Sequence, residues 1–170
     1  MAESKSKKMK NLEDLFVDVL QDIYDAEQQI VKALPKMAEN AQSKELKQGF
    51  NDHLEMTRKQ VERVEQIFKE LNMPAKGKHC KGMEGLIKEG DEILKEEMEP
   101  QVRDAALIAA AQKIEHYEIS GYGTARSYAQ ALGHQNIAKL LDQTAKEEGQ
   151  TDKLLTQMAE SNINQKAKAK

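Results

Sequence analysis

The sequence predicts an all-α protein built from four long helices. Of its 170 residues, 32% are charged and only 4% are aromatic, with no Trp, a composition typical of long helices rather than sheets. Only three prolines and nine glycines interrupt it. Apolar residues recur at intervals of three and four along four long stretches, which is the period of one helix face. The length suits one domain with a sizeable core.

The first helix is predicted to begin after Asn11, a residue type that caps the amide groups of a first turn. Its apolar stripe covers residues 12–37, and Pro35 should kink it near its end. Ser43 is the expected cap of the second helix, whose stripe covers residues 46–71. Because the link between them is short, these helices should form an antiparallel hairpin.

A long linker separates this hairpin from the second one. Residues 83–98 in the linker have an apolar edge and predict a short extra helix. Pro100 can open the third long helix at its first turn, and Gly133 is the expected C-terminal stop. After another short link, the fourth helix is predicted over residues 136–161.

The unequal links predict how the helices are connected. Two short links build two antiparallel hairpins, whereas a long middle linker permits a crossover that lets the second hairpin lie antiparallel to the first. That connection defines the ferritin-like four-helix bundle, here with a long crossover that carries a short extra helix. A plain up-and-down bundle with a decorated loop is the alternative that the sequence leaves open.

Polar residues interrupt the apolar stripes near the middle of each helix. Glu27 lies on the stripe of the first helix, between Ile23 and Ile30. A shift of 91 residues places Glu27 on Glu118 of the third helix, and Glu115 lies one turn before Glu118. These two helices therefore interrupt their stripes at the same depth.

The second and fourth helices repeat this arrangement. His53 lies on the stripe of the second helix, and a shift of 94 residues places it on Glu147, beside Glu148. Asp152 lies one turn beyond Glu148. The chain is thus a weak duplication in which each half carries potential metal ligands near mid-helix. The spacing leaves open which of Glu147 and Glu148 faces the core.

A bundle with the crossover brings these mid-helix groups together in its core. Several carboxylates cannot share a dry core as anions, and one histidine cannot neutralise them all. A divalent metal can, and carboxylate with imidazole suits iron or manganese rather than structural zinc. Two ions per chain, bridged by carboxylates, are the expected occupancy. The predicted ligands are Glu27, His53, Glu115, Glu118, Glu148 and Asp152.

Each of these residues also has an ordinary structural interpretation. His53 can equally be a hydrogen-bonded core histidine, and Asp152 can equally lie outside the site. Glu27 and Glu118 can be acids at the edge of the core, although their matched depth favours ligands. Glu55, two positions after His53, is expected to face solvent.

Charge and cysteine content exclude several other classes of protein. The formal net charge is −3, but the two ends of the chain are rich in Lys. Residues 1–10 are expected to be a disordered basic tail and residues 164–170 a second basic tail. The domain between them, residues 11–163, has 19 basic and 28 acidic residues. This acidic domain argues against nucleic acid as a partner. Cys80 is the single cysteine, which excludes an intrachain disulfide and a cysteine-rich zinc site. No apolar run reaches 18 residues and no signal peptide is visible, so we expect no membrane partner and a cytoplasmic location.

Four stretches of the chain resemble the YciE/YciF family of bacterial ferritin-like proteins. They are LEDLFVDVLQDIYDAEQQIVKALPKMAE, HLEMTRKQVERVEQIF, VRDAALIAAAQKIEHYEISGYGTARSYAQALG and EEGQTDKLLTQMAESNINQKA. The resemblance covers Asn11 to Ala167, and RDAALIAAAQKIEHYEI is its most distinctive part. It implies a ferritin-like bundle, a homodimer, a metal site in the core and a link to osmotic or oxidative stress in bacteria.

The chain departs from the wider ferritin-like pattern in its nitrogen ligands. Di-iron members typically carry a Glu-x-x-His in each half. Here His53 is followed by Leu54 and Glu55, and Thr151 occupies the position three after Glu148. A nitrogen-poor site should bind metal more weakly and hold a different redox potential. The pattern argues against efficient oxygen activation and is compatible with metal binding.

Two functional hypotheses of different classes follow. The first is an iron- or manganese-binding stress protein with peroxidase-, catalase- or ferroxidase-like chemistry, for which peroxide is the small oxidant. The second is a non-catalytic structural or interaction protein whose metal site is a folding staple or a relic. Iron storage ranks below both, because storage needs a closed shell of subunits rather than a dimer.

Overall fold

The structure, a computed structural model, describes residues 8–168 and shows four long helices with a short one in the crossover. The last long helix continues through a π-helical turn, η1, into a final short helix, α6. The elements are α1 (Leu12–Asn40), α2 (Lys44–Glu70), α3 (Lys81–Lys95), α4 (Pro100–Ala131), α5 (Gln135–Met158), η1 (Ala159–Ile163) and α6 (Asn164–Lys168).

The predicted start and stop signals are confirmed. The Asn11 side chain accepts a hydrogen bond of 2.8 Å from the amide of Asp14, and Ser43 caps α2 in the same way. Pro100 is the first residue of α4, where its missing N–H leaves no helical bond unmade. Gly133, just beyond α4, has a φ of 82°, a left-handed conformation that suits glycine. Local chemistry therefore sets most of the helix boundaries.

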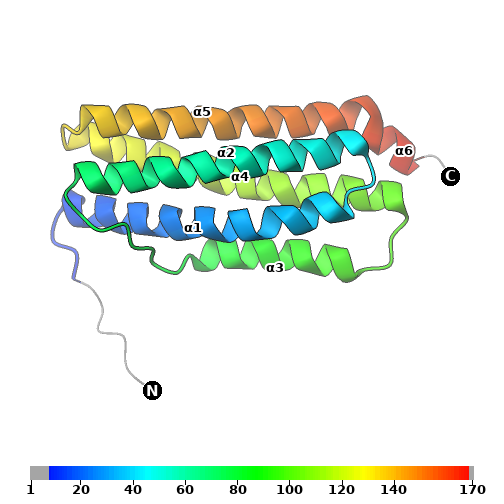
Figure 1. The fold of residues 1–170 in the computed structure, drawn as a ribbon, viewed down its shortest axis with the longest axis horizontal. Coiled ribbons are helices and arrows are strands. Elements are labelled where there is room, and N and C mark those ends of the chain that lie inside the picture. The colour runs from blue at the N-terminus through cyan, green and yellow to red at the C-terminus, as the bar shows by residue number, and fades with distance from the viewer. Residues whose placement is uncertain (1–7, 169–170) are drawn as a thin grey trace, which may run out of the picture.

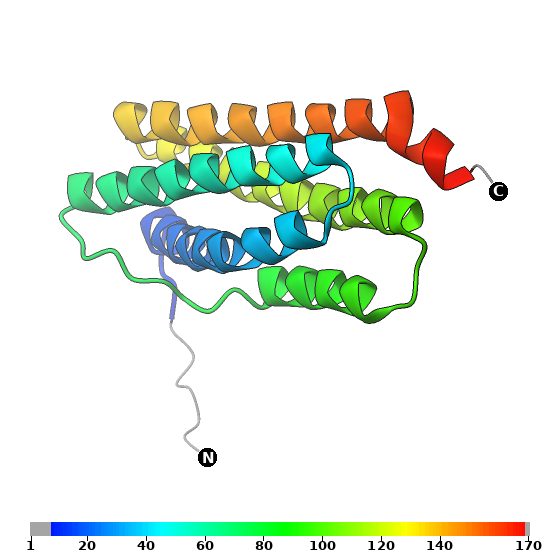
Figure 2. The same cartoon turned by 45° about the vertical axis from the view of Figure 1, so that its right-hand side comes forward.

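The helix directions match the crossover rather than the plain up-and-down bundle. Figure 1 shows α1 and α5 running in one direction and α2 and α4 running in the other. The linker between α2 and α4 therefore returns along the bundle, and α3 within it packs against α1 and α4 (Figures 1 and 2). The main contacts between long helices join α1 to α2, α4 to α5, α1 to α4 and α2 to α5. This is the ferritin-like arrangement.

Two apolar clusters fill the bundle, and a layer of buried polar side chains separates them. One cluster includes Ile30 and Phe50, and the other includes Leu20 and Phe68. Each long helix contributes to both clusters and passes between them through polar residues. This polar layer consists of Glu27 from α1, His53, Thr57 and Gln60 from α2, Glu115 and Glu118 from α4, and Thr144 and Glu148 from α5.

The two ends of the chain and the course of α1 at Pro35 were also predicted from the sequence. Pro35 lies inside α1, which continues to Asn40. The predicted basic tails fall partly outside the described residues, which leave out 1–7 and 169–170. Of the second tail, Asn164–Lys168 forms α6. Within residues 8–168, no helix is both long enough and apolar enough to cross a membrane.

Candidate metal centre

Four side chains of the polar layer form a compact cluster of potential metal ligands. His53 comes from α2, Glu115 and Glu118 from α4, and Glu148 from α5, and each offers one ligand atom within 4.8 Å of the others. All four are buried, with exposed fractions of 5% or less. Because α4 contributes residues at i and i+3, both carboxylates face the same side of that helix. The crossover places these two carboxylates opposite α2 and α5.

His53 presents one ring nitrogen to this cluster. Nε2 lies 3.2 Å from Oε1 of Glu115, yet it makes no aligned hydrogen bond. The other nitrogen, Nδ1, lies 3.5 Å from the hydroxyl of Thr151, which donates its own proton to the carbonyl oxygen of Glu147 at 3.2 Å. The hydroxyl oxygen is then available to accept from Nδ1–H. That tautomer leaves the lone pair of Nε2 facing the carboxylates, as a metal ligand requires.

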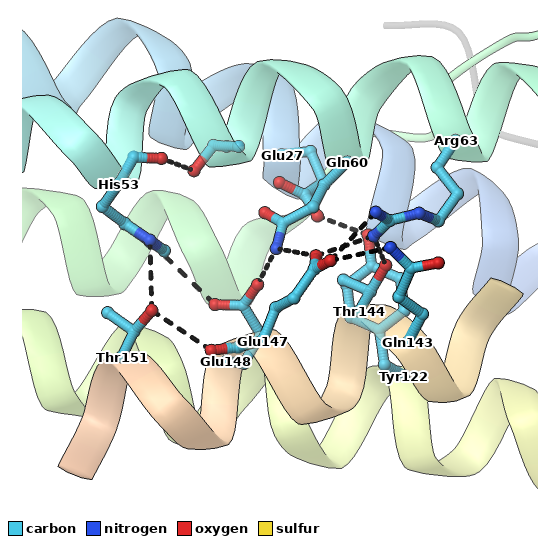
Figure 3. Close-up of polar contacts among 11 residues, drawn as sticks. Glu27, His53, Gln60, Arg63, Tyr122, Gln143, Thr144, Glu147, Glu148 and Thr151 are labelled. Atoms are coloured by element: carbon cyan, nitrogen blue, oxygen red, sulfur yellow. Dashed lines mark hydrogen bonds and ion pairs between the residues drawn. The ribbon is translucent and has the colours of Figure 1, made fainter. Parts of the chain in front are cut away.

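Glu27 lies beside the cluster of four rather than within it. Its side chain is fully buried, and the hydroxyl of Tyr122 donates a hydrogen bond to its Oε1 (Figure 3). Oε2 of Glu27 has no hydrogen-bond partner among the described residues. One oxygen is therefore held in place while the other is left for a ligand.

Glu148 is held by a polar network that extends outward to an arginine. The Gln60 amide donates to Oε1 of Glu148 and, at 3.2 Å, to Oε2 of Glu147. Arg63 then pairs with Glu147 through bonds of 2.8 and 3.0 Å (Figure 3). The structure thereby distinguishes two neighbouring acids. Glu148 faces the cluster, and Glu147 forms an ion pair with Arg63 at its edge.

Asp152 is placed at the rim of the site. Its Oδ1 lies 3.2 Å from Nε2 of His116, and the amide of Gln112 donates to the same oxygen at 3.0 Å. Asp152 is close enough to raise the pKa of Glu115, but it is not one of the four clustered residues. Glu55 is exposed and pairs with a neighbouring arginine on α2.

Burial raises the pKa of every glutamate in the layer. Desolvation is the largest cause, and it raises the pKa of Glu115 to about 7 and that of Glu27 to about 8. The pKa values of Glu118 and Glu148 are raised well above 4.5, again first by desolvation. Neighbouring carboxylates raise the pKa of Glu118 further. Without added positive charge, burial therefore favours the protonated form of each of these carboxyl groups.

The donor atoms that are left over fit a transition metal. Buried polar atoms without partners are costly, about 1–3 kcal/mol each, so a group of them indicates a ligand. Oxygen donors with one imidazole suit iron or manganese. Within the polar layer, the buried atoms without a hydrogen-bond partner are Oε2 of Glu27, Nε2 of His53, Oε1 of Gln60, Oε2 of Glu115, both carboxylate oxygens of Glu118 and Oε2 of Glu148. Elsewhere among the described residues, only Nε of Arg103 and Nε of Arg126 share this state.

Sequence reasoning missed two residues that position the cluster. Gln60 is fully buried and lies seven positions after His53 on the same stripe, so its helical spacing was an available signal. Arg63 gave no such signal, because its partner Glu147 lies on another helix and charge pairing across helices has no fixed sequence spacing.

The fold and the site together define a class of protein. It is an all-α, ferritin-like bundle with a buried cluster of carboxylates and one histidine. A family model described as a domain of unknown function (DUF892) matches residues 11–168, so the chain belongs to that family. Protein YciF of Escherichia coli is 47% identical over 163 residues, which cover 95% of this chain and 98% of YciF. The predicted family resemblance is therefore confirmed.

Two solved structures are similar to this chain in both fold and sequence. The structure of the E. coli stress protein YciF has a TM-score of 0.88 and 47% identity, and the match covers 92% of this chain and 99% of that one. YcfI from Rhodopseudomonas palustris, provisionally described as a structural protein, has a TM-score of 0.87 and 46% identity, with 89% and 96% of the two chains covered.

Proposed function

We propose that this protein binds iron or manganese in its polar layer and acts in a bacterial stress response. The observation that carries the proposal is the group of buried carboxylate and imidazole atoms without partners. Positive charge at this place would neutralise carboxylates that otherwise bind protons. The relation to YciF, which is described as a stress protein, supports the physiological setting.

Two ions per chain is the occupancy we propose. Glu118 or Glu148 would bridge the ions, Glu27 and His53 would be terminal ligands, and Glu115 would complete the set. Glu27 lies outside the group whose ligand atoms are within 4.8 Å of one another, which is consistent with a second ion on its side. Iron or manganese bound here would supply the change of oxidation state that reduction of a small oxidant such as peroxide requires.

The chain's own residues would prepare the ligands for that role. Tyr122 holds Oε1 of Glu27, and Gln60 holds Oε1 of Glu148, so each carboxylate keeps its other oxygen for a metal. Such supporting contacts orient ligands and raise metal affinity. The surrounding apolar clusters exclude bulk water from the layer.

We further propose a homodimer in the cytoplasm, with no nucleic-acid partner because the domain is acidic.

Elemental analysis of protein from metal-supplemented cells tests the proposal. We expect about two iron or manganese atoms per chain, lost in Glu27→Ala and Glu118→Ala and kept in Glu55→Ala, whose side chain is exposed. A folded parent without metal would contradict metal binding. Peroxide consumption that is identical in loaded and metal-free protein would contradict only the redox chemistry.

A non-catalytic structural protein is the second candidate function, and the provisional description of the similar YcfI favours it. In that case the metal would act as a folding staple across α2, α4 and α5. A metal that never changes valence in the presence of peroxide or reductant, combined with a large fall in Tm on its removal, would favour this candidate over the redox protein.

A further inference from the structure

Two pockets reach the candidate metal centre, and their chemistry differs. The apolar pocket lies inside the bundle between α1, α2, α4 and α5, encloses about 20 Å³ and has His53 and Glu115 in its wall. The polar pocket lies between α1 and α4, encloses about 280 Å³ and has Glu118 in its wall. Each pocket therefore ends on residues of the ligand cluster.

The polar pocket leads from an exposed edge to a buried carboxylate. Its walls also include Asp18, Asp22, Lys78 and Ser120. The Lys78 side chain is 52% exposed, whereas Glu118 is 3% exposed and neither of its carboxylate oxygens has a hydrogen-bond partner among the described residues. The pocket thus runs from solvent to the buried residue Glu118, whose carboxylate lies in the cluster.

The charges in the polar pocket favour a cation. Asp22 accepts hydrogen bonds through Oδ2 from the hydroxyl of Tyr117 at 2.9 Å and from the thiol of Cys80 at 3.2 Å. These neutral donors fix the carboxylate without neutralising it. Asp18 is instead paired with Lys78, whose Nζ lies 2.7 Å from Oδ2. The path to Glu118 therefore passes two carboxylates. Asp22 is held in place by neutral donors, and Asp18 is paired with the ammonium group of Lys78.

The apolar pocket lacks these features. Its volume of about 20 Å³ holds about one water molecule. Away from His53, Glu115 and Thr151 its walls are apolar side chains such as Phe50 and Leu155. A dication would have to lose much of its hydration shell along these apolar walls before it reached the oxygen atoms of Glu115 and Thr151. The polar pocket offers carboxylate and hydroxyl oxygens that can replace water step by step.

We propose that the polar pocket is the entrance through which a divalent cation reaches the metal centre, with Asp22 as its first carboxylate contact and Lys78 as an electrostatic gate. The inference rests on the metal binding proposed above. The Lys78 amide donates to the carbonyl oxygen of Gln21 at 3.0 Å, which fixes its backbone to α1. Its Nζ takes the place beside Asp18 that an incoming dication would occupy, so the side chain must swing outward during entry.

Matched bulky substitutions at the two mouths test the route. Ser120→Phe narrows the polar pocket, and Leu154→Phe narrows the apolar pocket, and both positions are exposed enough to spare the core. Metal-free protein is mixed rapidly with Mn²⁺, and uptake and release are followed by the EPR signal of free Mn²⁺. We expect Ser120→Phe to slow both about tenfold with little change in Kd, and Leu154→Phe to match the parent.

A charge pair tests the gate. Lys78→Met should speed Mn²⁺ uptake several-fold and Asp22→Asn should slow it, both effects shrinking at high salt. Lys88→Met is the control, because Lys88 pairs with Glu84 on α3 and does not line the pocket. Slower uptake in Leu154→Phe alone, or unchanged uptake in Ser120→Phe, overturns the route while leaving metal binding intact. A parent that binds neither Mn²⁺ nor Fe²⁺ at equilibrium overturns both.

Discussion

Tyr122 on α4 donates a hydrogen bond to Glu27 on α1, and both side chains are almost fully shielded from solvent. Glu27 was predicted from its place on the apolar stripe, whereas its partner decides how the carboxylate is oriented. Because Tyr122 engages Oε1, the unpartnered Oε2 is the oxygen left to bind a metal. A ligand carboxylate that is already oriented loses less entropy when the metal binds.

Tyr122→Phe is the direct test of this relationship. The variant keeps the ring in the core and removes the donor, so we expect metal affinity to fall about 10- to 100-fold. The metal-free protein should lose about 1–3 kcal/mol of unfolding free energy, because Oε1 of Glu27 is left buried without a partner. Metal titration and denaturant unfolding measure the two effects. Tyr128→Phe, on the same helix but less buried, is the control, and equal affinities in the two variants would contradict the assignment.

Glu118→Gln should have opposite effects on the two forms of the protein. Neither oxygen of Glu118 has a hydrogen-bond partner among the described residues, and burial raises its pKa well above 4.5. A neutral amide of the same shape removes the cost of a buried carboxylate, so metal-free protein at about pH 8 should gain about 1–3 kcal/mol. Metal binding should be lost. Denaturant unfolding with and without Mn²⁺ measures both, and a fall in stability of the metal-free variant would count against the prediction.

The stability of metal-free protein should decrease as pH rises. Desolvation raises the pKa of Glu115 to about 7 and that of Glu27 to about 8, from 4.5. The native state therefore keeps protons that the unfolded chain releases, and this contribution is fully present below about 4.5 and lost as pH rises through the native pKa values. Guanidinium unfolding of metal-free protein at about pH 5, 6.5 and 8.5 should show the decrease.

Metal should reverse this pH dependence, because ligands bind it in their deprotonated form. Protein in excess Mn²⁺ should become more stable over the same pH range. Parallel pH profiles with and without Mn²⁺ would mean that the carboxylates whose pKa values are raised are not the ligands.

The fold was predictable because its signals are local. Caps such as Asn11 and the stop at Gly133 depend on a few neighbouring residues, and each is observed as predicted. The crossover could only be favoured, because linker length permits two topologies and only the directions of the packed helices, with α2 and α4 running the same way, distinguish them (Figure 1). The π-helical turn Ala159–Ile163 was not foreseen, because nothing in the local sequence marks a change in helical hydrogen bonding.

The sequence was sufficient to predict which face of each helix carries the site, but not the role of each residue on that face. Spacing placed Glu27, His53 and Glu118 on core faces, and all three are buried. Adjacent residues on a helix differ by about 100° in direction, so an uncertain helix phase could not separate Glu147 from Glu148. Their roles depend on Arg63 of α2, which binds Glu147. Such pairing across helices can be known only once the helices are packed.

Asp152 was predicted to be a metal ligand, but its carboxylate lies at the rim of the site. Its Oδ1 is shared between His116 and the amide of Gln112. Those contacts hold the carboxylate at the rim, so Asp152→Asn should keep metal content and change metal affinity by less than about fivefold. Glu148→Gln, one helical turn away and fully buried, should lose metal. Elemental analysis and Mn²⁺ titration of the two variants compare them directly. Loss of metal in Asp152→Asn would mean that the carboxylate leaves His116 and turns inward when metal binds, and His116→Ala should then strengthen binding, because it releases Asp152 from the rim.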